Sequence, residues 1–204
     1  MTFSGVVLAG GASRRMGQDK AALVLGGETL LARVVRLLRA ATPEVFVIGP
    51  AERTLLVPGI PVVPDAQAGT GPLGAIATAL AQATTDYVFV AACDMPFLRP
   101  GLVRYLAALA SDFGVTVPRS ARGLEPLHAV YARSCLPVIA AMLAERAYAV
   151  GGLCARVPTR IVEPEEWSAH DPAGLSIMNV NTPAEWRAAL DRAGTGDLAG
   201  ESFL

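Results

Sequence analysis

Positions 3–11 read FSGVVLAGG, a short apolar run that stops at two glycines. An apolar run of this length without polar alternation is typical of a strand buried on both faces, as in a parallel sheet. The glycines then allow a tight change of direction. We therefore expect a β-strand from Phe3 to Ala9 and a fold built around it.

Extended and helical segments alternate along the rest of the chain. Apolar residues recur at helical spacing between Thr29 and Ala41, where Arg33, Arg36 and Arg39 occupy another side that we expect to be solvated. The other expected strands are 45–48, 60–63, 87–92, 115–118, 127–132 and 159–163, and the other expected helices are 71–83, 100–111, 134–145, 151–156 and 183–193. This alternation predicts a three-layer, Rossmann-like α/β fold with a mostly parallel central sheet.

The composition limits the classes of partner. The 204 residues carry 17 basic and 18 acidic side chains, a net charge of -1, which argues against a nucleic-acid partner or an anionic membrane. No apolar run approaches the ~18 residues that span a bilayer, and the first apolar stretch is too short for a signal-peptide core. We expect one soluble, cytoplasmic domain over residues 1–193 and a flexible tail over 194–204.

Cysteine and histidine show little sign of metal or covalent chemistry. Cys93, Cys135 and Cys154 are widely separated and form no C-x-x-C pair, so we expect reduced thiols rather than a disulfide or a zinc site. His128 and His170 are isolated from any Ser-His-Asp or His-metal spacing, and we interpret both as structural.

The loop after the first strand combines glycines with basic side chains. It reads LAGGASRRMGQDK at positions 8–20, so that three glycines let backbone amides approach an anion and Arg14, Arg15 and Lys20 supply positive charge. The pattern fits neither the Walker P-loop nor G-x-G-x-x-G. It indicates a phosphate-binding loop of another kind, and a glycine-rich connection with incidental surface arginines is the alternative.

Lys20 is the sole lysine of the chain, since the other 16 basic residues are arginines. The chance that a single lysine falls in this 13-residue stretch is roughly one in sixteen by length alone. Lysine is a compact charge on a flexible stem, unlike the planar guanidinium. We interpret Lys20 as a functional residue.

Asp94 comes just after the expected strand 87–92. In open α/β sheets ligands bind beyond the carboxyl ends of the strands, so Asp94 and the glycine loop are expected to face one crevice. Mg²⁺ commonly takes one or two carboxylates and completes its shell with water and phosphate, which makes Asp94 a candidate magnesium ligand. A helix or turn cap is the alternative for Asp94, and Asp65 alone is equally typical of a turn.

Asn179 and Asn181 alternate along an extended segment before a helix capped by Thr182. Alternating residues of an extended chain point the same way, so the two amides are expected to face an anion or a heterocycle together. Turn chemistry is the alternative for both.

In combination these residues resemble the molybdenum cofactor guanylyltransferases, the MobA-like nucleotidyltransferases. The likeness extends to about Leu190 and lies in the loop 8–20, Asp65, Gly71-Pro72-Leu73, Cys93-Asp94-Met95-Pro96, Glu125-Pro126-Leu127-His128-Ala129-Val130-Tyr131 and Asn179-Val180-Asn181-Thr182-Pro183. The resemblance implies a nucleotidyltransferase domain that transfers GMP from GTP to molybdopterin with release of pyrophosphate, yielding the molybdopterin guanine dinucleotide cofactor.

The resemblance also implies residue roles. The GTP site would comprise Leu8, Ala9, Gly10, Gly11, Lys20, Asp65 and Asp94, the catalytic residues would be Lys20, Arg15 and Asp94, the metal would be Mg²⁺ on Asp94, and Asn179 and Asn181 would lie on the molybdopterin side. Transient contacts with proteins that deliver molybdopterin or mature molybdoenzymes would follow from the same role.

The first loop also bears on the choice of base. Cytidylyl relatives typically have Leu-Ala-Ala-Gly in the first loop, so Gly10 favours GTP, because a glycine leaves more room for a purine. The chain departs from the family at Ile48-Gly49-Pro50-Ala51, where relatives often have an asparagine, and at Gly74-Ala75, which inverts the usual order. The alternatives are a molybdopterin cytidylyltransferase, a sugar-phosphate-type nucleotidyltransferase and a non-catalytic GTP-binding module.

Overall fold

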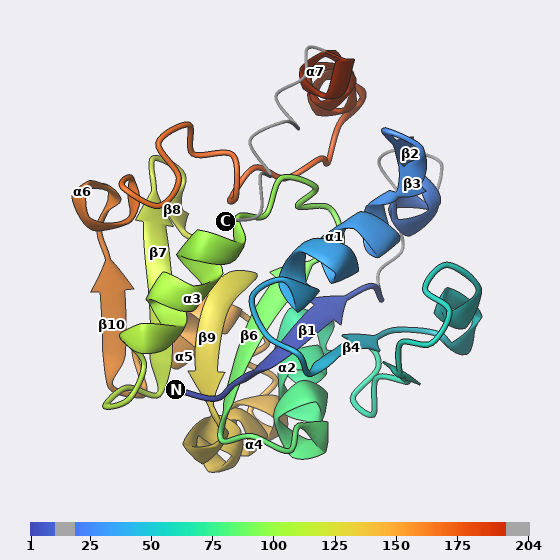
Figure 1. Cartoon of the computed structure of the whole chain (residues 1–204). Coiled ribbons are helices and arrows are strands. Elements are labelled where there is room, and N and C mark those ends of the chain that lie inside the picture. Colours follow the sequence, from blue (N-terminus) through green and yellow to red (C-terminus); the bar gives the residue numbers. More distant parts are fainter. Residues whose placement is uncertain (11–18, 195–204) are drawn as a thin grey trace.

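The computed structural model describes residues 1–10 and 19–194, in which a central β-sheet is covered by helices on both faces (Figure 1). The strands of this sheet are β1 (Ser4–Leu8), β4 (Val45–Ile48), β5 (Val62–Val63), β6 (Tyr87–Ala92), β7 (Val115–Ser120), β8 (Gly123–Leu124), β9 (His128–Ala132) and β10 (Thr159–Val162). Their order is β10-β7-β9-β6-β1-β4-β5, with β8 paired to β7. β9 is antiparallel to β6 and β7, whereas β1 is parallel to β4 and β6, and β5 and β10 are parallel to their neighbours. The predicted α/β fold with a mostly parallel sheet is confirmed.

β1 is buried on both faces, as its sequence predicts. Helices α1 (Leu30–Arg39) and α3 (Pro100–Ala108) cover the face that holds Val7, and α2 (Gly71–Gln82), α4 (Leu136–Ala144) and α5 (Val150–Cys154) cover the face that holds Val6 and Leu8. A Cβ on Gly5 would lie 2.7 Å from Cγ of Leu38, so glycine is what lets α1 approach the strand this closely.

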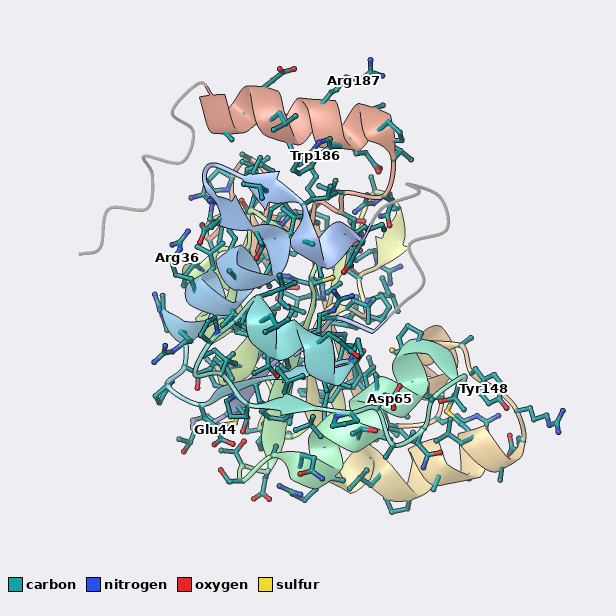
Figure 2. The ribbon with its side chains drawn as sticks, turned by 90° about the vertical axis from the view of Figure 1, so that its right-hand side faces the viewer. Arg36, Glu44, Asp65, Tyr148, Trp186 and Arg187 are labelled. Carbon is teal, nitrogen blue, oxygen red and sulfur yellow. The ribbon has the colours of Figure 1, made fainter. Side chains whose placement is uncertain are left out.

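A short hairpin, β2 (Val24–Leu25) and β3 (Glu28–Thr29), supports the last helix, α7 (Pro183–Gly194). Leu25 and Leu30 pack with Val180 and Ala189, and in Figure 2 Trp186 lies on the inner side of α7 while Arg187 points away. Apolar alternation does not reveal this hairpin, because each strand has only two residues. The packing fixes the segment before α7 against the body of the protein.

Four short helices complete the described structure. They are the 3-10 helices η1 (Lys20–Ala22), η2 (Ala51–Leu55) and η3 (Arg133–Cys135) and the one-turn helix α6 (Pro164–Trp167). Among the described residues, none of the helices is long and apolar enough to cross a membrane. The single domain over residues 1–193 stays a prediction. Of the predicted tail, residues 195–204 lie outside the described residues.

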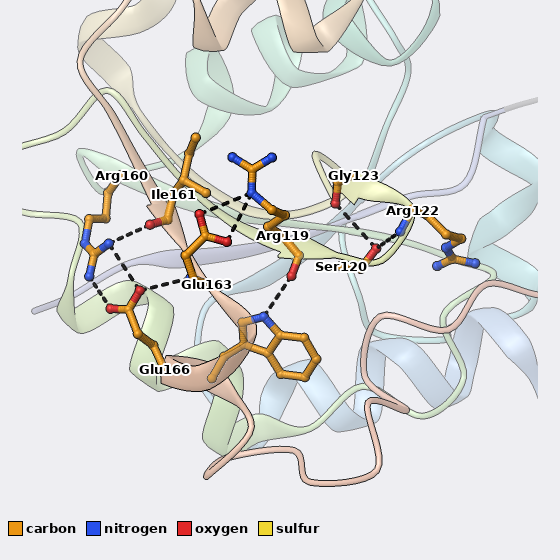
Figure 3. A network of polar contacts seen from close by, with 9 residues as sticks. Arg119, Ser120, Arg122, Gly123, Arg160, Ile161, Glu163 and Glu166 are labelled. Carbon is orange, nitrogen blue, oxygen red and sulfur yellow. Dashed lines mark hydrogen bonds and ion pairs between the residues drawn. The ribbon is translucent and has the colours of Figure 1, made fainter.

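Ion pairs and hydrogen bonds stabilise the edge of the sheet formed by β7 and β10. Arg119 on β7 donates to Glu163 at 3.1 Å, and the indole nitrogen of Trp167 donates to the Arg119 carbonyl at 3.0 Å (Figure 3). Arg160 on β10 pairs with Glu166, whose carboxylate also accepts from the Glu163 amide in a capping box. These contacts hold α6 against β7 and β10.

His128 lies in the core beneath α3. Its ring is fully buried, meets Phe89 edge-to-face at 5.0 Å between centroids, and has Nε2 3.3 Å from the Ser176 hydroxyl. Burial lowers the pKa of His128 to about 3, because the charged ring would lose its hydration. The ring is therefore neutral in the folded protein at neutral pH.

We expect His128→Gln to reduce the acid sensitivity of the fold. Below the unfolded-state pKa of about 6.5, the unfolded chain binds a proton at this histidine that the folded protein does not, so stability falls as pH falls. The loss by pH 5 is about 2 kcal/mol in the free energy of unfolding. Urea unfolding at pH 7 and pH 5 measures it, with exposed His170→Gln as the control. If His128→Gln loses as much free energy of unfolding between pH 7 and pH 5 as the wild type, His128 is not the source of the acid sensitivity.

Candidate functional site

A cavity of about 730 Å³ opens where four neighbouring strands end. Its walls include Gly10 after β1, Gly49 after β4, Asp65 after β5 and Asp94 after β6, with Pro72 from the first turn of α2. These are the carboxyl ends of parallel strands, where ligands bind in open α/β sheets. The structure therefore brings the predicted strand-end residues to one cavity.

Backbone hydrogen bonds bring the first loop and Asp94 together. The Ala9 amide donates to the Ile48 carbonyl at 2.8 Å, and the Cys93 amide donates to the Leu8 carbonyl at 3.1 Å. Among the described residues, a Cβ on Gly10 would meet only the Cα of Gly49, at an ordinary 3.8 Å. Gly10 lines the cavity, and no packing contact with the described residues requires a glycine at this position.

Lys20, Asp94 and Asn181 form one polar cluster at this cavity. The Lys20 ammonium donates to Oδ2 of Asp94 at 3.1 Å and to Oδ1 of Asn181 at 2.6 Å. The side chains of Lys20 and Asp94 are only 16% and 15% exposed, so the charges interact through a partly desolvated environment. Asn181 is thus in contact with a lysine 161 positions earlier in the chain.

Each member of the cluster is held by its own element. Asp19 caps η1 by accepting from the Ala21 amide at 3.2 Å, and Lys20 is the first residue of that turn. The Val180 amide donates to the Asp94 carbonyl at 2.9 Å. The Glu185 carboxylate accepts from the Asn181 amide at 2.8 Å. These backbone contacts therefore fix the chain on which each member of the cluster stands.

Arg33 supports the segment after Asp94. It is 3% exposed and donates from Nε to the Pro96 carbonyl at 2.6 Å, with its guanidinium 5.9 Å from the centroid of Phe97. The prediction that this residue belongs to a solvated helix face is wrong, because a long side chain can cross a helix surface to reach a buried carbonyl.

The donors at the cluster suit a hard cation. Burial and the neighbouring Asp94 charge raise the pKa of Cys93 to about 12, so this cavity-lining thiol stays protonated and is a poor metal ligand. In the described part of the chain, no three His, Cys, Asp or Glu side chains are grouped to enclose a metal. The carboxylate of Asp94 matches Mg²⁺, which needs few protein ligands when substrate phosphates supply others.

Asp65 has a turn role and also lines the cavity. Its Oδ1 accepts from the Gln67 amide at 2.9 Å and from the Thr78 hydroxyl at 3.1 Å, and the residue also lines the cavity. A Cβ on Gly74 would lie 1.9 Å from the Thr70 hydroxyl oxygen and 2.9 Å from the Gln67 carbonyl oxygen. The glycine of the inverted Gly74-Ala75 pair is thus required by the close packing of this turn on α2.

The other predicted site residues are not all in the cavity. Asn179 precedes Asn181 in the same segment, and neither asparagine is among the residues that line the cavity. Gly11 and Arg15 lie outside the described residues.

Sequence reasoning missed Arg53. This side chain lines the cavity from η2, donates from Nε to the Ala9 carbonyl at 3.1 Å, and forms a two-pronged ion pair with Asp19. No motif marks it, and a basic residue shortly after Gly49 is the only sequence signal.

A family model described as a MobA-like NTP transferase domain matches residues 5–157. This chain belongs to the MobA-like NTP transferase family. A probable molybdenum cofactor guanylyltransferase of Pelotomaculum thermopropionicum is 40% identical over 182 residues, which cover 89% of each chain. A second, from Carboxydothermus hydrogenoformans, is 34% identical over 90% of this chain and 93% of its own length. Membership of this family makes the chain a nucleotidyltransferase.

Solved structures show the same fold. Molybdopterin-guanine dinucleotide biosynthesis protein A of Archaeoglobus fulgidus superposes on this MobA-like chain with a TM-score of 0.84 at 24% identity, covering 95% of this chain and 100% of that one. The 2-C-methyl-D-erythritol 4-phosphate cytidylyltransferase of Thermus thermophilus has a TM-score of 0.68 at 21% identity, covering 95% and 100%. Because a cytidylyltransferase shares it, this fold alone does not select the base.

Proposed function

We propose that this enzyme transfers GMP from GTP to molybdopterin and releases pyrophosphate. The observation that carries the proposal is the Lys20–Asp94–Asn181 cluster, which joins the nucleotide-sized cavity to the segment 179–181. In the reaction an oxygen of the molybdopterin phosphate attacks the α-phosphorus of GTP. One P–O bond forms, the bond to the bridging α–β oxygen breaks, and pyrophosphate leaves.

The protein contributes positioning and charge rather than covalent chemistry, as is usual for phosphoryl-type transfer. Leu8, Ala9 and Gly10, which line the cavity at the end of β1, are proposed to contact the nucleotide. The Lys20 ammonium, on its flexible stem, can exchange the Asp94 carboxylate for a phosphate oxygen. Arg15, outside the described residues, is proposed to add positive charge.

Asp94 is the proposed ligand of Mg²⁺, which when bound would neutralise phosphate charge at the reacting centre. Asp94 is suited to this because it stands at the end of β6 and lines the cavity. Asn181 and Asn179 are proposed to face the acceptor, since Asn181 contacts Lys20 without lining the cavity.

Guanine is favoured as the base by the space next to Gly10, which the described structure does not fill with side chains. The relatives named guanylyltransferases support the same choice. Action in the cytoplasm and transient contacts with proteins that supply molybdopterin or mature molybdoenzymes belong to the same proposal.

The proposal is tested by incubating the purified protein and Mg²⁺ with GTP, CTP, ATP or UTP, each alone, with molybdopterin or with a sugar phosphate. Pyrophosphate release and the mass of the product are measured. We expect a molybdopterin guanine dinucleotide, formed only from GTP with molybdopterin. A cytosine dinucleotide would establish the cytidylyl alternative, release with a sugar phosphate would change the acceptor, and GTP binding without any release would indicate a binding module.

A further inference from the structure

Arg53 connects two parts of the nucleotide site that are ten positions apart in the chain. Its Nε donates to the carbonyl of Ala9 at 3.1 Å, and a terminal nitrogen donates to Oδ1 of Asp19 at 2.9 Å. The other terminal nitrogen pairs with Oδ2 of the same carboxylate. One guanidinium thus holds the end of β1 and the residue directly before Lys20.

The contact is specific in shape, and it joins a largely buried arginine to an aspartate side chain that is 44% exposed. The Arg53 side chain is only 12% exposed, and it reaches three acceptor atoms with the planar, forked geometry that arginine has and lysine lacks. The Arg53 guanidinium holds the pKa of Asp19 below its usual value, chiefly through the side-chain hydrogen bond. Asp19 is therefore a charged partner of Arg53 at neutral pH.

The same carboxylate also caps the helical turn that carries Lys20. Oδ1 of Asp19 accepts from the Ala21 amide at 3.2 Å and so caps η1, the turn that begins at Lys20. A Cβ on Gly49 would lie 3.2 Å from the Ala9 carbonyl and 3.4 Å from Cγ of Arg53, so glycine there lets the arginine cross closely over the strand end. Any displacement of Asp19 relative to Ala9 would move the start of η1 as well.

We infer that Arg53 is a positioning residue of the nucleotide site: it ties Asp19 to the end of β1 and thereby sets the Lys20 ammonium at the cavity. The inference rests on the proposed function in taking a nucleoside triphosphate as the ligand. It goes beyond that function in assigning the geometry of Lys20 to an arginine on a separate element. Misplacement of a charge by about 1 Å can cost on the order of 100-fold in rate.

The test compares Arg53→Ala, Arg53→Lys, Asp19→Asn and the double variant Arg53→Ala/Asp19→Asn with the wild type. The amide introduced by Asp19→Asn keeps an oxygen that can cap η1 but removes the charge that Arg53 holds. Arg104→Ala is the matched control, because Arg104 donates to the Ala40 carbonyl outside the cavity. The readouts are the Kd for fluorescent mant-GTP with Mg²⁺ and no acceptor, the melting temperature, and kcat and KM for transfer.

We expect Arg53→Ala and Asp19→Asn each to weaken mant-GTP binding by about 10-fold and to lower kcat, with little change in melting temperature. Arg53→Lys should bind mant-GTP no better than Arg53→Ala does. The double variant should bind mant-GTP no more weakly than the single variant with the lower affinity. Wild-type affinity and kcat in either single variant, effects that multiply in the double variant, or full rescue by lysine would overturn the inference. If Arg53→Ala does not fold, Asp19→Asn and Arg53→Lys still decide it.

The binding arm separates this inference from the proposed function. If the wild type binds mant-GTP but transfers GMP to no acceptor, the proposed function fails while the comparison of Kd values still tests Arg53. If the wild type prefers another nucleotide, the mant derivative of that nucleotide is used. If it binds none, both proposals fail.

Discussion

Lys20→Ala is expected to lower the rate of GMP transfer by about 100-fold or more. The ammonium is in contact with both Asp94 and Asn181, so its loss removes positive charge from the proposed triphosphate site and leaves the Asp94 carboxylate without this partner. The measurement is kcat/KM from pyrophosphate release, with circular dichroism and melting temperature to establish that the variant is folded.

Lys20→Arg is the informative companion to the alanine variant. Arginine keeps the charge but replaces a compact ammonium by a planar fork, in a chain whose other basic residues are all arginine. We expect it to recover only part of the activity. Turnover of Lys20→Ala at the wild-type level would remove this residue from the mechanism.

Asp94→Asn is expected to reduce transfer by about 100-fold or more at saturating Mg²⁺. The amide has nearly the same shape as the carboxylate and can still accept from Lys20, so the fold should be preserved while the negative charge that favours Mg²⁺ is lost. Turnover is measured as a function of Mg²⁺ and of Mn²⁺ concentration.

Asp86→Asn is the matched control for this substitution. Asp86 precedes the amino end of β6, whereas Asp94 follows its carboxyl end, and both carboxylates pair with a cation, Asp86 with Arg133 at 3.6 Å. We expect Asp86→Asn to keep wild-type turnover and metal dependence. Equal activity in Asp94→Asn and Asp86→Asn would contradict the metal assignment.

The residues at the strand ends can be predicted from the sequence, because apolar runs mark the strands and parallel strands end at one edge of the sheet. The apolar run before Gly10 and the run before Asp94 predict strands, and parallel strands must present their carboxyl ends at one edge. The cavity wall between Gly10 and Asp94 is therefore predictable from the sequence, and the structure bears this geometry out.

The contact of Lys20 with Asn181 was not predictable in the same way. It depends on how α7 packs on the β2–β3 hairpin, and two-residue strands leave no periodic signal. The φ angles of Gly26 and Gly27, 62° and 88°, show a glycine turn whose Gly-Gly pair is the one sequence clue to the hairpin. Arg53 was missed for a related reason, since its role exists only once Ala9 and Asp19 are close in space.

Asp65 and Arg33 show why a single residue can support two interpretations. Asp65 makes the turn contacts expected of an aspartate in a loop, yet it also lines the cavity. Arg33 belongs to an amphipathic helix but is buried against the Pro96 carbonyl. In both cases the side chain's partners, rather than its pattern in the sequence, decide what it does.

The most direct test of the central claim is the anomalous difference map of a crystal grown with GTP and with Mn²⁺ in place of Mg²⁺. We predict a nucleotide in the cavity between Gly10 and Asp65, a manganese peak coordinated by Asp94, and the Lys20 ammonium directed at the triphosphate. A nucleotide bound outside this cavity, or a metal bound away from Asp94 with the Lys20–Asp94 pair intact, would contradict the account.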